Sequence, residues 1–231
     1  MSQNGCLVCG GFLEYGKLEK HTCLFCGKEF EAEVSCVHKH YICDHCHSSE
    51  AVEILEKFIA VTELKDPIQM ADIIMHHPSF KMHGTEHHYL VPAVLVKSIQ
   101  NSGYEVNNLF FNIVKARGSS LPGGTCGYWG ACATAIGCGI SSAIYLKTSP
   151  LSTDNYSLVH SFTADAINEI AKKPGPRCCK RNTYTSILAG IKSFKKYTDI
   201  EIQASTPVCS FFKDNNECLG LECPYFPGAN K

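Results

Sequence analysis

The first 46 residues of this chain hold seven cysteines, most of them in pairs separated by two residues. A two-residue gap lets both thiolates of a pair turn toward one metal ion, and a glycine after the pair eases the tight turn. Thiolates and imidazoles in tetrahedral array are typical of zinc, so we expect a zinc-binding module here. The candidate ligands are Cys6, Cys9, Cys23, Cys26, Cys36, His40, Cys43 and Cys46, with His38 as an alternative to His40.

The order of these ligands leaves two arrangements open. Counted as four pairs, they are Cys6/Cys9, Cys23/Cys26, Cys36/His40 and Cys43/Cys46. In a cross-brace, as in RING and FYVE-like fingers, the first and third pairs hold one ion and the second and fourth pairs hold another. In a zinc ribbon, the first two pairs share one ion. Both arrangements close the coordination sphere with protein ligands, so we expect structural ions, two of them in the cross-brace that we favour.

Metal ligands and disulfides are competing explanations for fifteen cysteines in 231 residues. A disulfide framework needs an oxidising compartment. The first residues, Met1 to Cys6, contain neither the basic nor the apolar stretch of a secretory signal. We therefore expect a cytoplasmic protein with reduced cysteines, best suited to a reducing or anaerobic cell.

Length and charge restrict the remaining possibilities. The chain is long enough for a small module and one medium domain, which we place at 1–47 and 48–231. The net charge of −1 gives no electrostatic basis for nucleic-acid binding. Residues 118–145 carry no charge and are long enough to span a bilayer. Gly, Ser, Thr, Cys and Ala dominate this segment, so we expect a closely packed buried helix and no membrane partner.

Periodicity and capping signals predict a mainly α protein, with a helical bundle after a small module of β-knuckles. We expect two short strands in the module, at 18–22 and 29–34. Ser48 to Glu50 signal the start of a helix, Pro67 starts a second, and Thr85 caps a third that continues to residue 103. Further helices are expected at 107–116, 126–146, 154–172 and 180–197, with a strand-like segment at 201–204.

Five of the eleven histidines fall within residues 76–88. Two of them end one expected helix and three begin the next, where the helix dipole favours an anion and lowers the pKa of a histidine. Neutral imidazoles can bind a metal or exchange a proton, so we predict a functional site; histidines that cap helices or fill the core are the alternative. The candidate metal ligands are His83 and His87, and the candidate proton carriers are Glu86, His87 and His88.

Cys126 follows a glycine loop at the expected start of the long helix 126–146. Backbone N–H groups at a helix start stabilise a thiolate, so Cys126 is a candidate nucleophile, redox thiol or cluster ligand. The preceding glycines would let a ligand approach the backbone closely. Cys132 and Cys138 follow at steps of six residues, which point to different faces of one helix, so we expect both to be small core residues.

The last third of the chain contains five more cysteines. Adjacent Cys178 and Cys179 are flanked by Arg177 and Lys180, whose charges favour thiolates. The last cysteine is followed by proline, as is the last ligand of many iron–sulfur loops. The spacing matches no standard ferredoxin run, so a third zinc site or free buried thiols stay open beside an iron–sulfur cluster or iron. The candidate cofactor ligands are Cys178, Cys179, Cys209, Cys218 and Cys223.

Four segments together resemble an uncharacterised Cys/His-rich domain family of mainly anaerobic prokaryotes, whose members occur alone or fused to radical-SAM or methyltransferase modules. They are Cys43–His47, Met82–Ala93, Cys126–Cys132 and Gly175–Lys180. The resemblance spans most of the chain and implies no established activity. The chain has neither the CxxxCxxC motif of a radical-SAM enzyme nor a glycine-rich methyltransferase loop, so such an enzyme would be a separate protein partner.

Two functions fit these residues. In the first, which we favour, the helical domain assembles Cys126, the histidine segment and Cys178/Cys179 into the pocket of an enzyme that transfers electrons, sulfur or a methyl group. Cys126 would be the nucleophile or an open-site ligand, and Arg177 would bind an anionic small-molecule substrate. In the second, the chain is a non-catalytic zinc adaptor that docks onto a radical-SAM or methyltransferase enzyme.

Overall fold

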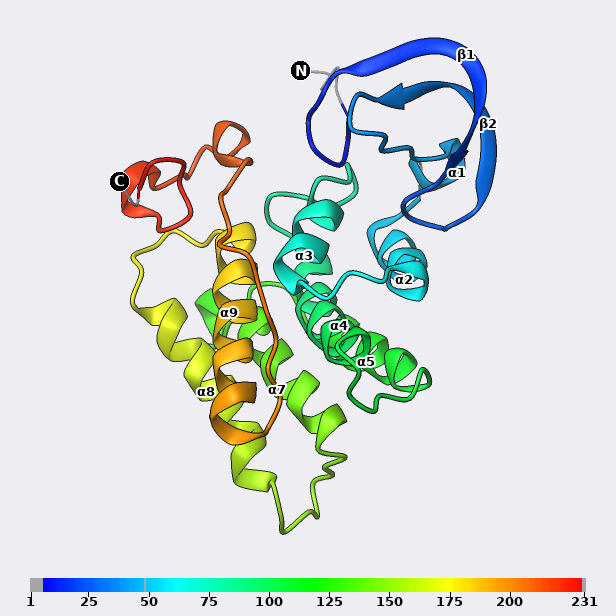
Figure 1. Ribbon diagram of the computed structural model, residues 1–231. Coiled ribbons are helices and arrows are strands. Elements are labelled where there is room, and N and C mark those ends of the chain that lie inside the picture. Colours follow the sequence, from blue (N-terminus) through cyan, green and yellow to red (C-terminus); the bar gives the residue numbers. More distant parts are fainter. Residues whose placement is uncertain (1–5, 48, 230–231) are drawn as a thin grey trace. The chain divides into compact units, whose positions relative to one another are not determined.

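The computed structural model of the protein describes residues 6–47 and 49–229, and Figure 1 labels its helices and strands. The chain divides into two compact units. The first combines the residues up to Glu63 with Asp72–Lys81, and the second combines Leu64–Ala71 with the chain from Met82 onward. The domain division at residues 47 and 48 stays a prediction.

The first unit is built on a β-hairpin. Strands β1 (Leu13–Thr22) and β2 (Glu29–Cys36) pair antiparallel, and the register joins the first residue of β1 to the last residue of β2 at the open end. The predicted strands are therefore present and longer than expected. No side chain of β1 is buried, and an isolated hairpin is marginally stable in water. The hairpin needs a further source of stability.

Two short helices follow the hairpin in the first unit: α1 (Asp44–His47) and α2 (Ala51–Val61). Phe58 of α2 meets Phe25 edge-on at 5.9 Å between ring centroids, and His77 meets the same ring at 5.5 Å. This core is small. Burial alone stabilises such a unit only weakly, and natural modules of this size commonly add a metal.

The second unit is helical, and the unit boundary falls within α3 (Pro67–Met75). Its helices are α4 (Glu86–Asn101), α5 (Phe110–Ser119), α6 (Thr125–Tyr128), α7 (Ala133–Tyr145), α8 (Tyr156–Ala171) and α9 (Cys179–Tyr197). Two short 3₁₀ turns follow, η1 (Phe212–Asp214) and η2 (Gly220–Glu222). The chain is therefore mainly α, with one small two-stranded sheet near its N-terminus.

Helix α4 is the centre of the second unit. It packs against α5, α7 and α9, and its residues are buried on nearly every side. A helix that is apolar around most of its circumference is stable only when neighbours cover it on several sides. Gly118 of α5 and Gly137 of α7 allow two of these close contacts, against Tyr89 and Pro92 respectively.

The chain after α9 returns along that helix toward its first turn (Figure 1). There the Cys209 N–H donates to the carbonyl of Tyr225 at 2.7 Å. The Tyr225 hydroxyl lies 3.0 Å from the Thr185 hydroxyl of α9. The C-terminal segment, residues 208–229, is thereby fixed beside the start of α9.

The predicted single helix 126–146 is wrong. The structure has two helices, α6 and α7, because Gly130 adopts φ 67° just after the end of α6. A glycine in this left-handed conformation ends a helix. Cys126 therefore lies in a four-residue helix, whose dipole is too short for the effect expected from a long one.

Three smaller expectations are also corrected. The side chain of Thr85 makes no capping hydrogen bond, since its own backbone is already helical. The helix predicted at 107–116 begins at Phe110, because Asn107 turns the chain first. Residues 201–204 belong to the irregular segment after α9 and form no strand. The helix-start signal at Ser48 lies outside the described residues, although α2 begins close to it.

Across the described ranges 6–47 and 49–229, none of the helices combines the length and apolarity needed to cross a membrane. The uncharged segment 118–145 instead contributes the packed helix α7, whose side chains are mostly buried. Small residues there let neighbouring helices approach closely. This agrees with the packing expected from its composition.

The close contact between α4 and α5 can be tested at Gly118. A Cβ atom there would lie 2.8 Å from the backbone Cα of Tyr89, so one of the helices must move. We expect Gly118→Ala to lower the free energy of unfolding by about 1–3 kcal/mol, as overpacked cores do. Thermal unfolding measures this.

The matched control is Gly127→Ala, because a Cβ at Gly127 has no neighbour within 4 Å. It should change the free energy of unfolding by less than about 0.5 kcal/mol. A Gly118→Ala protein as stable as this control would contradict the close approach of α4 and α5.

Candidate metal centres

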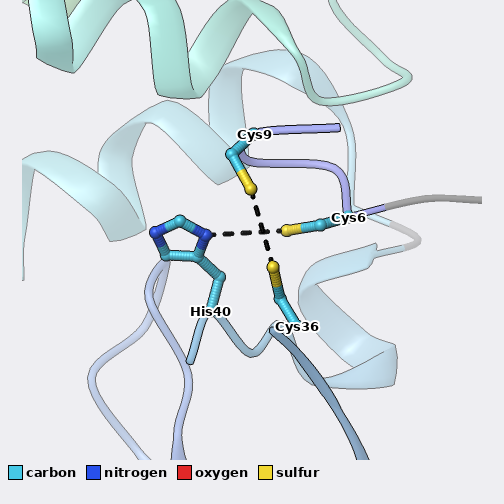
Figure 2. Close-up of side chains that lie close together, drawn as sticks. All are labelled: Cys6, Cys9, Cys36 and His40. Atoms are coloured by element: carbon cyan, nitrogen blue, oxygen red, sulfur yellow. Dashed lines mark hydrogen bonds between the residues drawn. The ribbon is translucent and has the colours of Figure 1, made fainter. Parts of the chain in front are cut away.

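Four side chains of the first unit point to one common centre in Figure 2: Cys6, Cys9, Cys36 and His40. Their ligand atoms all lie within 4.8 Å of one another. The Sγ atoms of Cys9 and Cys36 are 3.5 Å apart, and Cys6 Sγ lies 3.7 Å from His40 Nδ1. Four ligands around one zinc ion, with Zn–S about 2.3 Å, place their sulfurs about 3.8 Å apart. The cluster therefore has the spacing of a tetrahedral metal site.

A second cluster is made of cysteines alone: Cys23, Cys26, Cys43 and Cys46. These four ligand atoms also lie within 4.8 Å of one another, and the sulfurs of Cys26 and Cys43 are 4.0 Å apart. Three of the four residues are buried. This separation is far too long for a disulfide, and all fifteen cysteines of the chain are free thiols.

The β-hairpin explains how the ligands are shared. Cys23 and Cys26 lie in the turn between β1 and β2, whereas Cys36 ends β2 at the open end, beside the Cys6 turn. The chain then returns to the hairpin turn, where the N–H of Leu24 donates to the carbonyl of Tyr41. The first and third pairs therefore meet, as do the second and fourth. The structure forms this alternating arrangement and not the ribbon.

Backbone N–H groups support both clusters. The N–H of Val8 donates to Cys6 Sγ, and that of Cys43 donates to Cys23 Sγ, both at 3.4 Å. Such bonds orient thiolates around a metal. Hydrogen bonds to sulfur outweigh burial at Cys36 and Cys23 and lower the pKa of both thiols, to about 6 for Cys36. At Cys6 and Cys46 burial dominates: it raises the pKa of Cys6 to about 11 and also raises that of Cys46. Without a cation these thiols stay protonated at neutral pH, so a bound metal is what would make them thiolates.

The imidazole of His40 completes the first cluster, and His38 lies just beside it. The Nδ1 of His38 is 3.4 Å from Cys9 Sγ and 3.8 Å from Cys36 Sγ. His38 is exposed, however, and is not one of the four mutually close ligands. Its position suits a hydrogen bond to a ligand thiolate rather than coordination.

The helical unit contains a cavity of about 20 Å³ that four cysteines line: Cys178, Cys209, Cys218 and Cys223. Cys178 comes from the cap of α9, and the other three come from the C-terminal segment that returns to it. Donors surround the sulfurs: the N–H of Arg181 and the Asn215 side-chain amide reach Cys178 Sγ. Among the described residues, no three of these sulfurs lie mutually within 4.8 Å. They are therefore spaced too widely for one ion.

Two buried cations share the wall of this cavity. Lys180 is 1 % exposed and Arg181 is 6 % exposed. Lys180 Nζ lies 4.5 Å from the ring centroid of Phe211. Burial lowers the pKa of Lys180 to about 8, although the Glu86 carboxylate opposes the shift. From the sequence, Lys180 is expected only as a charge beside the two cysteines and nothing singles out Arg181, because charges at the start of a helix are normally solvated.

The predicted thiolate character of Cys178 and Cys179 is wrong. Burial raises the pKa of Cys178, and it raises the pKa of Cys179 to about 11. The neighbouring charge of Arg177 lowers the pKa of Cys179 less than burial raises it. Cys178 lines the four-cysteine cavity, whereas Cys179 is not part of its wall.

The histidine segment divides between the two units. In the first unit, His77 Nε2 donates to the Cys46 carbonyl at 2.8 Å, so this residue supports the second cluster. His76 Nδ1 donates to the carbonyl of Asp72. Both are the capping and core histidines that the alternative interpretation expected.

In the second unit, His87 is fully buried and its Nδ1 lies 3.7 Å from the Glu86 carboxylate. Its pKa falls well below the usual value, as predicted, but burial and then the Lys180 charge are the main causes, not the helix dipole. His88 Nδ1 donates to the carbonyl of Leu121, and His83 Nε2 lies 3.3 Å from Glu217. In the described chain, neither His83 nor His87 belongs to a group of three mutually close ligand atoms, so their metal role stays a prediction.

Cys126 lies in another cavity of the helical unit, of about 610 Å³, together with Arg177. None of the histidines lines this cavity. Cys132 is at the cap of α7, where the amide of Asn182 donates to its sulfur. Cys138 is fully buried in the core and donates to the carbonyl of Ser186, as a small core residue. Of the predicted catalytic residues, Cys126 and Arg177 share this cavity, whereas Glu86, His87 and His88 are not part of its described wall.

The fold and these sites define a mainly helical, cysteine-rich protein with two Cys/His clusters that could hold metal ions. A family model described as a family of unknown function (DUF5714) matches residues 55–226, well over half of the chain. The chain belongs to this family. The match contains the late cysteines and most of the helical unit, whereas Cys43–His47 and all other ligands of the two clusters precede it. No curated protein and no solved structure matches the chain.

The roles of the two neighbouring histidines can be separated by substitution. We expect His40→Gln to lose one metal ion per chain, because it removes one of four ligands. We expect His38→Gln to keep both ions and to weaken metal affinity about 10- to 100-fold, as loss of an outer hydrogen bond does. Elemental analysis and chelator competition measure both. Retention of both ions by His40→Gln, or loss of one by His38→Gln, would contradict this assignment.

Metal removal should affect the two units differently. The hairpin has little buried apolar surface, so we expect a strong chelator to expose its backbone amides to rapid hydrogen exchange. Amides of α4 should stay protected, since packed helices surround that helix. Hydrogen exchange read by mass spectrometry resolves the two segments. Equal protection of the hairpin with and without chelator would refute a structural role of the metal.

Proposed function

We propose that this chain is a zinc-stabilised iron–sulfur protein that performs a redox or group-transfer reaction, moving electrons, sulfur or a methyl group. The two clusters of the first unit bind structural zinc, and the four-cysteine cavity binds an iron–sulfur cluster. A reduced, cytoplasmic and anaerobic setting suits such a protein, because fifteen free thiols persist there.

The observation that carries this proposal is the four-cysteine cavity. An iron–sulfur cluster binds each thiolate through a different iron, so it separates the four sulfurs more widely than one ion does. The wide spacing of Cys178, Cys209, Cys218 and Cys223 fits that requirement better than it fits zinc. The free space is about 20 Å³, so a bound cluster requires the C-terminal segment to move outward. That segment contains only two short 3₁₀ turns, and its movement would break the hydrogen bond between the Tyr225 and Thr185 hydroxyls.

Charge in the cavity supports the same cofactor. Arg181 is buried in its wall, and a buried cation favours a neighbouring negative charge. A cluster held by four thiolates is anionic and supplies that charge. The N–H donors to Cys178 and Cys218 are of the kind that tune the reduction potential of a cluster.

Zinc fits the two clusters of the first unit for a different reason. Both are closed by four protein ligands, and all eight are thiolates or imidazole. Closed sites of this composition are structural and do not leave a position for substrate. Any chemistry therefore belongs to the helical unit, where Cys126, the half-buried Glu86 and the buried His87 are the candidate reactive groups.

The test is metal content with an absorption spectrum on protein purified without oxygen. We expect two zinc ions per chain, together with iron, acid-labile sulfide and a broad band at about 400 nm. Cys209→Ser should lose the iron and the band while keeping both zinc ions, because Cys209 lines the four-cysteine cavity.

Cys138→Ser is the matched control, since Cys138 is buried in the core and lines no part of that cavity. It should keep zinc, iron and colour. A colourless wild-type protein with zinc alone, or a Cys209→Ser protein with unchanged iron, would overturn the iron–sulfur proposal.

A second candidate function is a zinc adaptor that docks onto a separate radical-SAM or methyltransferase enzyme. It is favoured by apolar side chains exposed around the hairpin: Phe12 at 81 %, Tyr15 at 79 % and Leu18 at 59 %. An apolar surface of this kind is typical of a protein-binding site. The adaptor would contain zinc alone, and Cys209→Ser would leave its partner binding intact.

A further inference from the structure

In the part of the chain that the structure describes, the cavity around Cys126 is lined by three cationic side chains and by no carboxylate side chain. Lys173, Arg177 and Arg181 contribute the charges, and the amide of Asn182 adds a hydrogen-bond donor. Its volume of about 610 Å³ is that of a small-molecule site. Cys126 is half-buried within it, which leaves its sulfur within reach of a bound molecule.

Arg181 is the residue that distinguishes this cavity from a merely basic surface. It is 6 % exposed, and its Nη2 donates to the carbonyls of Pro174 and Pro176 at 3.2 and 3.0 Å. Its buried Nε has no hydrogen-bond partner among the residues the structure describes. A buried donor without a partner is costly, and a ligand is one way to satisfy it.

We propose that this cavity binds a small anion, a molecule with a carboxylate or a phosphate group, beside the Cys126 thiol. Arg177 and Lys173 attract the anion from solvent, and Arg181 with Asn182 fixes its charged group. The Nη2 of Arg181 already donates to two carbonyls, so its Nε–H, without a partner among the described residues, is the donor left for the anion. Part of the anion then lies against Cys126, which is the only cysteine in the described wall of the cavity.

Arg181 also connects this cavity to the four-cysteine cavity, because it lines both. An anion bound on one side and an anionic cofactor on the other share one buried guanidinium. The inference deepens the proposed function, on which it rests for this connection, by naming a carboxylate or phosphate compound as the substrate class. Anion binding itself needs no cofactor and is tested separately.

The experiment compares two alkylating agents on the full-length, metal-loaded protein. With both iodoacetate and iodoacetamide, the Cys126 sulfur forms a bond to the CH₂ carbon, iodide leaves, and the thiol proton goes to the buffer. The agents differ only in that iodoacetate carries a carboxylate. Peptide mass spectrometry gives the rate at Cys126 with each agent, and the rate ratio for glutathione corrects for their intrinsic reactivity.

We expect the corrected iodoacetate-to-iodoacetamide ratio at Cys126 to be raised about fivefold or more, since each nearby cation attracts the carboxylate. Arg177→Ala and Lys173→Ala should each lower the ratio. Lys192→Ala is the control, because Lys192 is an exposed cation of the same helix as Arg181, about 16 Å further along it. It should leave the ratio unchanged.

A competition experiment identifies the bound group. Millimolar inorganic phosphate or malonate should slow the reaction of Cys126 with iodoacetamide, and the more effective of the two shows whether the site prefers phosphate or carboxylate. A ratio equal to that of glutathione would overturn the proposal. A raised ratio without protection by either anion would overturn it too, because a general surface field would then be sufficient. Loss of iron from the protein bears only on the proposed cofactor, so the two proposals fail separately.

Discussion

Burial of thiols that come from distant parts of the chain is the constraint on which this structure depends. Cys6 meets Cys36, Cys23 meets Cys43, and Cys178 shares a cavity with three cysteines of the C-terminal segment. Burial raises the pKa of Cys6, Cys178 and Cys209 and so disfavours these thiolates until a cation is present, whereas hydrogen bonds lower the pKa of Cys36 and Cys23 despite their burial. Metal binding then stabilises both the thiolates and the contacts between segments.

The two units meet this constraint in different ways. The first has a hairpin without buried side chains on β1, so the geometry of its ligands replaces most of an apolar core. The second has a core of its own around α4, with glycines that let α5 and α7 approach it closely. The packed helices of this unit do not depend on Lys180 or Arg181 for their stability. They can therefore bury these two charged side chains in the walls of its cavities.

Arg181 lies between the two cavities of the helical unit that have functional candidates in their walls. A single buried guanidinium lines two cavities of different character, one walled by four cysteines and the other open to solvent beside Cys126. The proposed transfer reaction would need its reactive centre close to the substrate. A shared positive side chain provides such proximity and favours negative charge on both sides. The closed clusters of the first unit have no comparable opening, since four protein ligands surround each centre.

The sequence by itself determined what depends on short spacing. The two-residue gaps identified the cluster ligands, and their order favoured the alternating arrangement that the hairpin forms. Strong periodicity located α3, α4, α8 and α9. Local geometry is sufficient for these features, because a pair of thiolates or one turn of helix involves only a few neighbouring residues.

Only the tertiary structure decided which distant residues share a site. The return of the C-terminal segment along α9 brings Cys209, Cys218 and Cys223 to Cys178 and buries Lys180, whose charge would otherwise suggest a solvated surface. Gly130 takes a left-handed conformation that ends the helix of Cys126 after about one turn, and the described wall of the Cys126 cavity contains none of the expected histidines. These features depend on packing between residues that are distant in the sequence, so they cannot be predicted from any short segment alone.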